Sequence, residues 1–233
     1  MKILFEPNEK YIQQITTWLF EESQSGLNSF IYNFNNSQFT NDNFICLIDD
    51  NDFCIGYISY SIIDKYAKIE VVVIKNNKKR NGFGKILLNE LTVHLLNKNV
   101  VVMELFCEPS SSKKIWKKLG FKEFKEKENH KFLNSKDFKN PWLYKPLVPE
   151  VSSTKNHKLN SYIELWTISE HSASNYSPQY KWDLLTPNST IIYPIDEEWK
   201  IKYVSEGNII YEGMIKRFSK QKIAFGNFLI INN

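Results

Sequence analysis

The chain has 233 residues, of which 42% are hydrophobic and 15% aromatic, a composition typical of packed cores rather than of a disordered protein. Lys and Arg outnumber Asp and Glu by 21 to 18 up to residue 150 and by 9 to 8 beyond it, so the charge does not predict a nucleic-acid partner. No run approaches the roughly 18 apolar residues of a membrane-spanning helix, and no membrane span is predicted.

The three cysteines, Cys46, Cys54 and Cys107, lie within apolar, strand-like segments and lack the spacing of metal ligands. We therefore expect buried thiols, no bound metal, and a protein of the reducing cytoplasm. Cys107 lies close to the cleft in which a ligand is expected to bind, as argued below. Its apolar surroundings favour a buried core thiol over a catalytic nucleophile. The first residues, MKILFEPNEKYIQQ, contain too short an apolar patch for a secretory signal.

The first third of the chain predicts a strand, a helix and a hairpin. Residues 1–6 are expected to form a strand and Glu9 to Glu22 a helix. Residues 44–64 are expected to form a hairpin, because acids and an asparagine interrupt the apolar run at 49–52.

A junction between a strand and a helix follows, in the sequence IEVVVIKNNKKRNGFG and then KILLNELTVHLL. Two of the chain's eight glycines, Gly82 and Gly84, lie at this junction. Glycine permits a positive φ and a close approach of a ligand, and the start of a helix offers free N–H groups to an anion. The cations around it, with no acid among them, are Lys75, Lys78, Lys79, Arg80 and Lys85. The junction therefore predicts a ligand that carries phosphate.

Two common nucleotide motifs do not fit this junction. The dinucleotide pattern G-x-G-x-x-G requires a third glycine where the chain has Leu87. The P-loop pattern requires its first glycine at Lys79, and a Ser or Thr where the chain has Ile86.

A second motif lies about thirty residues downstream. An apolar strand, VVMELF, is followed by a short helix and by Leu119-Gly120-Phe121, which opens another strand. Trp116 stands four residues before the glycine.

Together the two motifs resemble the GNAT superfamily of N-acyltransferases over roughly residues 1–147. The family's acyl-CoA loop has the pattern [QR]-x-x-G-x-[GA], and here Lys79 stands at the Gln/Arg position while Gly82 and Gly84 match. The L-G-F turn after an aromatic-bearing helix is also characteristic of the family. The resemblance implies an α/β (α+β) fold, with a mixed central sheet flanked by helices.

The resemblance further implies acetyl-CoA as cosubstrate and assigns its binding residues. The edge of the strand at 72–74 would pair with the pantetheine amides as an added strand does, and an N–H near Val73 and Ile74 would hold the oxyanion. The amides of 79–84 would hold the pyrophosphate, with side-chain donors from Asn81 and Lys85. The predicted cofactor-binding residues are Val72, Val73, Ile74, Lys79, Arg80, Asn81, Gly82, Phe83, Gly84 and Lys85.

Glu70 is the first candidate for a catalytic base. By the two-residue period it shares a face with Val72 and Ile74, and in a strand buried on both faces its carboxylate would have a raised pKa. It could then take a proton through water from the attacking amine. A solvated strand end is the competing interpretation, and Glu104 and Glu108 on the next strand are alternatives.

Trp116 occupies the position at which many family members carry a tyrosine that protonates the leaving thiolate. An indole N–H donates a hydrogen bond but is no proton acid, so Trp116 would pack against the pantetheine arm or fill the core. The four lysines on the same short helix form either a solvated face or a rim of the cofactor site: Lys113, Lys114, Lys117 and Lys118.

Composition changes near Pro149, and we predict three parts: residues 1–148 as the acyl-CoA-binding domain, 149–159 as a linker and 160–233 as a small, mainly antiparallel β domain. The third part would be a barrel or sheet of four to six strands, with a hairpin turn at 205–208. Its sequence resembles no family. The aromatic residues Tyr176, Tyr180 and Trp182 would cover its core or, in a second interpretation, form a recognition loop.

The sequence thus predicts an N-acetyltransferase that moves the acetyl group of acetyl-CoA to a primary amine by direct attack on the thioester. The alternative is a non-catalytic CoA-binding or partner-binding protein with a degenerate cleft. The acceptor would be a small amine or a protein or peptide amine, and the family resemblance allows a homodimer paired through sheet edges.

Overall fold

The computed structural model describes residues 1–27, 43–124, 141–156, 158–184, 190–218, 224–225 and 227–232. Its chain divides into two units, one of residues 1–62 with 67–106 and the other of residues 63–66 with 107–233. Among the described residues, no helix is long and apolar enough to cross a membrane.

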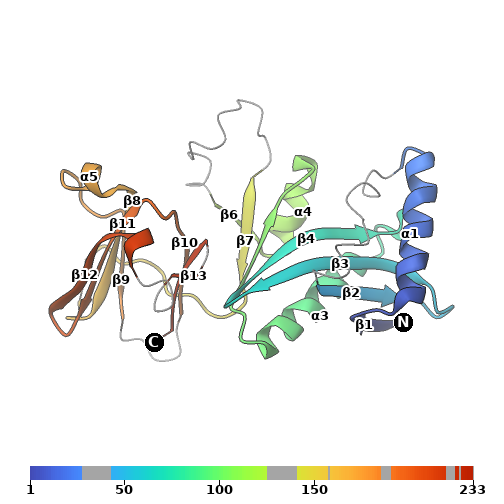
Figure 1. The fold of residues 1–233 in the computed structure, drawn as a ribbon, viewed down its shortest axis with the longest axis horizontal. Helices are drawn as coiled ribbons and strands as arrows, with labels where there is room; N and C mark the ends of the chain where they lie inside the picture. The colour runs from blue at the N-terminus through green and yellow to red at the C-terminus, as the bar shows by residue number, and fades with distance from the viewer. Residues whose placement is uncertain are drawn as a thin grey trace. The chain divides into compact units, whose positions relative to one another are not determined.

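The first unit is a mixed sheet with helices. Its strands lie in the order β1-β2-β3-β4-β5, with β1 antiparallel to β2 and β2 antiparallel to β3, and helix α3 connects β4 to β5 (Figure 1). The elements are β1 (Lys2–Phe5), α1 (Glu9–Gln24), β2 (Asn43–Ile48), β3 (Cys54–Ile63), β4 (Tyr66–Ile74), η2 (Asn76–Lys78), α3 (Phe83–Asn97) and β5 (Val102–Phe106). The predicted strand, helix and hairpin are confirmed, and α1 continues two residues further than expected.

Helix α1 buries one stripe of side chains against one face of the sheet. The stripe follows the helical period and consists of Tyr11, Ile15, Trp18, Leu19 and Glu22. Its apolar members share a core with residues of β2, β3 and β4, among them Cys46, Cys54 and Tyr57. Both thiols are free and buried, and the hydrogen bond with Cys54 together with burial raises the pKa of Cys46. The prediction of buried thiols is confirmed.

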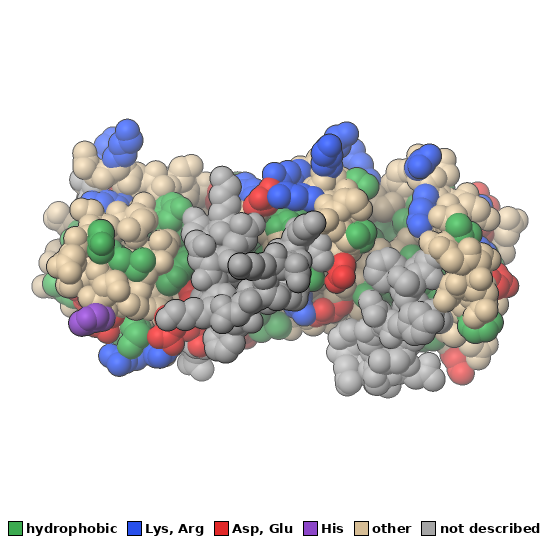
Figure 2. All heavy atoms as spheres, turned by 90° about the horizontal axis from the view of Figure 1, so that it is seen from above, with side chains coloured by type: hydrophobic (Ala, Val, Ile, Leu, Met, Phe, Trp, Pro, Cys, Tyr) green, Lys and Arg blue, Asp and Glu red, His purple; other side chains and the backbone are tan. Residues whose placement is uncertain are grey.

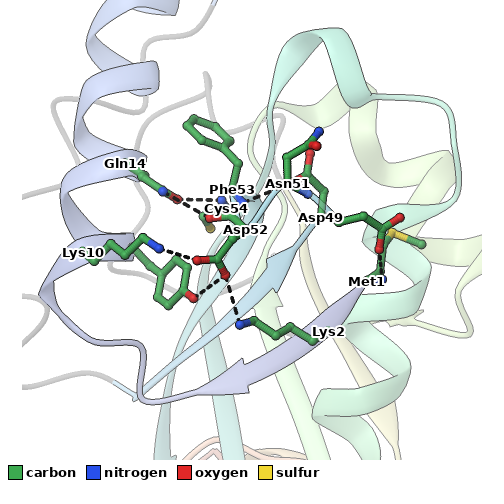
Figure 3. Close-up of polar contacts among 11 residues, drawn as sticks. Met1, Lys2, Lys10, Gln14, Asp49, Asn51, Asp52, Phe53 and Cys54 are labelled. Atoms are coloured by element: carbon green, nitrogen blue, oxygen red, sulfur yellow. Dashed lines mark hydrogen bonds and ion pairs between the residues drawn. The ribbon is translucent and has the colours of Figure 1, made fainter.

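The first turns of α1 are fixed to the β2–β3 turn by Asp52 (Figure 3). Its carboxylate accepts a hydrogen bond from the Tyr11 hydroxyl at 2.8 Å and forms ion pairs with Lys2 and Lys10. One turn further on, the side chain of Gln14 accepts the Cys54 N–H at 2.8 Å and donates to the Asp52 carbonyl at 3.3 Å. These bonds set the position of α1 at the start of β3.

Helix α3 buries Leu87, Leu88, Leu91 and Leu95. It approaches β3 closely at Gly56, where an added Cβ would lie 2.4 Å from the Ile74 Cδ1, 3.0 Å from the Val73 carbonyl oxygen and 3.4 Å from the Leu87 Cδ1. Only glycine leaves room here for β4 and α3 to pack against β3.

The second unit contains a short helix followed by several antiparallel sheets. It consists of η3 (Ser110–Ser112), α4 (Lys113–Lys118), β6 (Lys122–Glu123), β7 (Trp142–Pro146), β8 (Tyr162–Ser169), α5 (Glu170–Ala173), β9 (Tyr180–Asp183), β10 (Thr190–Pro194), β11 (Trp199–Ser205), β12 (Asn208–Met214), η5 (Ile215–Arg217), β13 (Ala224–Phe225) and β14 (Phe228–Asn232). Strands β6 and β7 pair antiparallel, and the later strands form one sheet in the order β12-β11-β8-β9 and another in the order β10-β14-β13.

The later strands differ from the prediction of a single barrel or sheet of four to six strands. The described residues give seven strands, β8 to β14, in two sheets. Near the end of the chain, β13 pairs antiparallel with β14, with Phe225 opposite Phe228. The predicted hairpin at 205–208 is confirmed, with Glu206 and Gly207 at positive φ between Ser205 and Asn208.

One hydrophobic core serves both sheets of the second unit. Ile163, Trp182 and Ile201 enter it from the first sheet, and Ile191 and Leu229 from the second. It also includes Phe124, just after β6, and Trp142 and Tyr144 of β7 pack against it.

The aromatic residues that follow β8 divide between the two interpretations. Trp182 is 2% exposed and stacks with Tyr180, so these rings cover the core. Tyr176 is 63% exposed, and its carbonyl accepts the indole N–H of Trp166 at 2.7 Å.

Residues 149–156, expected to belong to a linker, run along strand edges. The Val151 N–H donates to the Thr190 carbonyl at 3.0 Å, and the Thr154 N–H donates to the Lys181 carbonyl at 2.7 Å. The segment therefore pairs with β10 and then with β9. The boundaries 1–148 and 160–233 stay a prediction.

We expect Gly56→Ala to lower the free energy of unfolding by about 1–3 kcal/mol, the usual range for overpacking a core. The Val73 carbonyl cannot move without disturbing β4. Gly84→Ala is the matched control, because its Cβ would lie at an ordinary 3.8 Å from Ile74. Urea denaturation measures both variants, and equal stability of the two would contradict the close approach at Gly56.

We also expect Asp52 to make the stability depend on acid pH. Hydrogen bonds from Lys10, Tyr11 and Lys2 hold the pKa of Asp52 well below its ordinary range. Its contribution is therefore complete above the unfolded-state pKa of about 3.9 and is lost as the pH falls toward the lower folded-state pKa. Asp52→Asn should flatten the stability profile below about pH 4, whereas Asp64→Asn, at an exposed turn, should not. Thermal melts across this pH range distinguish the two.

Candidate anion-binding site

The loop between β4 and α3 contains residues with a left-handed backbone conformation just before the helix begins. Gly82 is the N-cap of α3 with φ 80° and ψ 0°, and Arg80 has φ 68°. The helix begins when the Lys85 and Ile86 amides donate to the Gly82 carbonyl at 3.0 and 3.2 Å. Apart from its chain neighbours, no described residue has an atom within 4 Å of where a Cβ of Gly82 would be, so the backbone here is open on the side of the described residues.

The first half of the loop is held by the protein itself. The Lys75 amide donates to the Ile55 carbonyl at 2.9 Å, and the Asn76 amide donates to the Glu22 carboxylate at 2.5 Å. The amides of Lys78 and Lys79 then donate to carbonyls of Lys75 and Asn76, which forms the η2 turn. All four amides therefore have acceptors.

The second half of the loop has the opposite character. The backbone amides of five successive residues donate no hydrogen bond to any residue in the described part of the chain: Arg80, Asn81, Gly82, Phe83 and Gly84. Several adjacent free N–H groups at the positive end of a helix form an anion-binding nest. These residues therefore form a candidate site for an anion such as a phosphate group.

The charged side chains of the loop divide in the same way. Lys75 lies with its Nζ 4.5 Å from the centre of the Phe53 ring, and Lys78 lies 3.7 Å from the Asp49 carboxylate. Both anchor the loop to the β2–β3 turn. Lys79, Arg80 and Lys85 are exposed and form no ion pair with a described residue. Three of the five predicted cations thus remain for an anion.

Asn81 has a different role from the one expected. Its side-chain Nδ2 donates to the carbonyls of Lys78 at 3.1 Å and Lys79 at 3.3 Å. It stabilises the turn of the loop, and its backbone amide is the group available to a ligand.

Strand β4, which enters the loop, alternates along its length. Ile69, Val71 and Val73 are buried, while Val72 and Ile74 are partly exposed. Glu70 lies on the same side as Val72 and Ile74, as its spacing predicted. The Glu70 residue taken as a whole is exposed, whereas its side chain alone is only 28% exposed. The main chain of β4 at this position therefore contributes to the accessible surface.

The expected burial of Glu70 is wrong. Its carboxylate forms an ion pair with Lys68 at 2.7 Å and accepts a hydrogen bond from the Ser61 hydroxyl at 3.4 Å. The polar neighbours Lys68 and Ser61 keep this part of β4 solvated. Of the alternatives, Glu108 is exposed and Glu104, within β5, is only 3% exposed. Glu104 is thus the buried one of the three candidate carboxylates, in keeping with its apolar neighbours on both sides in VVMELF.

Comparison with known proteins agrees with this geometry. Residues 10–121 match the model of the acetyltransferase (GNAT) family. The chain carries a GNAT acetyltransferase domain. A search of the curated proteins found no match.

Solved structures share the fold of this GNAT domain. An aminoglycoside 6'-acetyltransferase of type Ii is 16% identical with a TM-score of 0.51, over 65% of this chain and 100% of that one. An aminoglycoside 6'-N-acetyltransferase complexed with coenzyme A is 13% identical with a TM-score of 0.50, over 65% and 100%. A Lactobacillus plantarum protein named as a putative N-acetyltransferase is 13% identical with a TM-score of 0.50, over 63% of this chain and 98% of that one.

The second motif of the GNAT domain lies in the second unit and forms a small packed turn. Trp116 is half-buried and meets Phe121 edge-on, with ring centres 5.2 Å apart. Gly120 between them has φ 92°. Lys145 of β7 lies over the Phe121 ring at 6.0 Å, and burial lowers the pKa of Lys145. Trp116 therefore has a packing role in this turn.

Only some of the lysines of α4 form a solvated face. Lys113 and Lys117 both form ion pairs with Glu123 of β6, whereas Lys114 and Lys118 are exposed. Cys107 is buried, and its sulfur lies 3.3 Å from the Ser112 hydroxyl. On the face drawn in Figure 2, Lys and Arg side chains form several small groups rather than one continuous basic surface.

Among the described residues, no group of three or more His, Cys, Asp and Glu side chains could hold a metal ion.

We expect Gly82→Ala to lower the free energy of unfolding by about 1–2 kcal/mol, the cost of a left-handed conformation for an L-residue. Because space at this position is open, backbone strain is the whole effect. Gly82→Asn should cost less, since Asn tolerates this conformation better. Urea denaturation of the two variants is the measurement, and an alanine variant as stable as the wild type would contradict the left-handed N-cap.

Proposed function

We propose that this protein is an N-acetyltransferase that moves the acetyl group of acetyl-CoA to a primary amine by direct attack on the thioester. The single observation that carries the proposal is the run of five free amides at the start of α3, with three exposed cations beside it. A pyrophosphate accompanied by one further phosphate on the ribose, as in CoA, fits this combination of donors and charge.

When bound, acetyl-CoA would supply an activated acyl group and a thiolate leaving group. The amides of 80–84 would hold its pyrophosphate, with Lys79, Arg80 and Lys85 beside them. The partly exposed side of β4, at Val72 and Ile74, would orient the pantetheine arm, and the N–H groups near Val73 and Ile74 would stabilise negative charge on the acyl oxygen.

The attacking amine must lose its proton, and this requirement depends on the acceptor. A lysine-like amine with a pKa near 10.4 is roughly 3.4 units from neutrality at pH 7, which corresponds to about 4.6 kcal/mol. An α-amine with a pKa near 7.7–8.0 needs little assistance. Glu70 remains our first proposed base: an exposed carboxylate can accept a proton through water, and Glu104 is the buried alternative.

The acceptor would be a small amine or an amine of a peptide or protein. Two of the solved structures with this fold are named as aminoglycoside acetyltransferases, so an aminoglycoside belongs in a first panel with a polyamine and a lysine peptide. We propose a cytoplasmic protein, because acetyl-CoA and reduced thiols are found there, and a homodimer paired through sheet edges.

A non-catalytic CoA-binding protein is the second candidate. It is favoured by Trp116, which packs on Phe121 and cannot act as the proton acid that a tyrosine provides. A thiol with a pKa near 8.5 is nevertheless a fair leaving group without one. The intact loop is shared by both candidates, so only turnover separates them.

Isothermal titration calorimetry with acetyl-CoA and with CoA is the first test. We expect micromolar binding by the wild type and at least a tenfold loss in Lys79→Ala/Arg80→Ala/Lys85→Ala, because these side chains are the free charges of the loop. Lys114→Ala/Lys118→Ala, which removes exposed lysines of α4, is the matched control and should bind as the wild type does.

Thiol release with the amine panel follows. Turnover on any amine supports the transferase, and binding without turnover supports the second candidate. Absence of binding by the wild type would overturn both.

A further inference from the structure

The carboxylate of Glu22 occupies an unusual position on α1. It is 7% exposed and continues the stripe of Tyr11, Ile15 and Trp18, where an apolar side chain would be expected. It also lies in the last turn of the helix, where the dipole disfavours negative charge and where the turn itself contains no basic residue. A buried acid in such a place requires a specific partner.

The backbone amide of Asn76 is such a partner. Its N–H donates to the Glu22 Oε1 at 2.5 Å, across 54 residues of sequence. Asn76 is the first residue of η2. It directly follows Lys75, whose amide donates to the Ile55 carbonyl in the last hydrogen bond between this part of the chain and the sheet. The Glu22 carboxylate therefore holds the loop at the first residue after its last hydrogen bond to the sheet.

Further bonds of the loop continue from this point, beside the bond from the Lys78 amide to the Lys75 carbonyl. The Asn76 carbonyl accepts the Lys79 amide at 3.2 Å, and the Lys78 and Lys79 carbonyls accept the Asn81 side chain. The free amides of 80–84 begin immediately after this chain of bonds. A displaced Asn76 would leave the η2 turn, and with it the nest, without a fixed orientation.

We propose that Glu22 is the positioning residue of the anion-binding loop. It fixes the entry of the loop through the Asn76 amide and does not contact the ligand, so the last turn of α1 and the phosphate site move together. The identity of the ligand as CoA rests on the proposed function, whereas the positioning itself does not.

Three variants test the positioning. Glu22→Ala removes the acceptor, Glu22→Gln keeps an acceptor oxygen of similar reach without the charge, and Glu21→Ala is a matched control at the exposed neighbouring position. Amide hydrogen exchange by NMR, without ligand, is read at Asn76, Lys78 and Lys79. The Lys75 amide, which bonds to the sheet, serves as the internal reference.

We expect Glu22→Ala to raise exchange at these three amides by at least tenfold while Lys75 stays protected. Glu22→Gln should lie near the wild type, and Glu21→Ala should be indistinguishable from it. Unchanged exchange in Glu22→Ala would overturn the proposal, as would a rise that includes Lys75 equally, since that indicates general loss of stability. A Glu22→Gln variant as unprotected as Glu22→Ala would overturn the role of the acceptor oxygen.

The ligand arm uses CoA in calorimetry. We expect about tenfold weaker binding in Glu22→Ala, which corresponds to about 1.4 kcal/mol, and smaller loss in Glu22→Gln. Equal affinity of Glu22→Ala and the wild type would overturn the coupling of α1 to the site. If the wild type binds no CoA, the proposed function falls, and the exchange data alone then decide for or against the positioning role.

Discussion

The hydrogen bond between the Asn76 amide and the Glu22 carboxylate fixes the first of two stretches of one loop that differ in their backbone hydrogen bonds. In the first stretch, the amides of Lys75, Asn76, Lys78 and Lys79 have acceptors within the protein, which avoids the free-energy cost of an unpaired amide. In the second stretch, the amides of 80–84 donate to no described residue and are free for the proposed ligand. A group outside the loop helps to fix the first stretch. Helix α1 supplies that group, just as its Gln14 supplies an acceptor at the start of β3.

Charge follows the same division. Lys75 and Lys78 hold the loop to the β2–β3 turn through Phe53 and Asp49, and neither is free to follow a ligand. Preorganised donors cost less entropy on binding than side chains that must be ordered. The fixed amides can therefore provide orientation to the proposed ligand, while the exposed side chains of Lys79, Arg80 and Lys85 would add attraction that salt would screen.

The sequence predicted those features whose cause is local. Gly82 adopts the left-handed conformation expected of a glycine before a helix, and Glu206 and Gly207 form the expected hairpin turn. The contacts that sequence reasoning missed join distant residues: Asp49 to Lys78 and Glu22 to Asn76. No period or spacing connects such pairs. The expected burial of Glu70 failed for a more local reason: Lys68, two residues earlier on the same strand, forms an ion pair with it, and Ser61 of the neighbouring strand donates a hydrogen bond.

The boundary between the two predicted domains illustrates how composition and packing can differ. Composition changes at Pro149, yet Phe124 already belongs to the core that β8 to β14 enclose, and Trp142 and Tyr144 of β7 pack against it. Tyr144 also lies 6.0 Å from the Phe228 ring of β14. A polar segment such as 149–156 therefore does not mark a gap in the packing, since its own amides pair with the edges of β10 and β9. The family match ends at residue 121, three residues before Phe124, so Phe124, β7 and the β region that follows lie beyond the match and bury their apolar side chains together. That shared burial makes the β region part of the stability of the second unit, whatever it recognises.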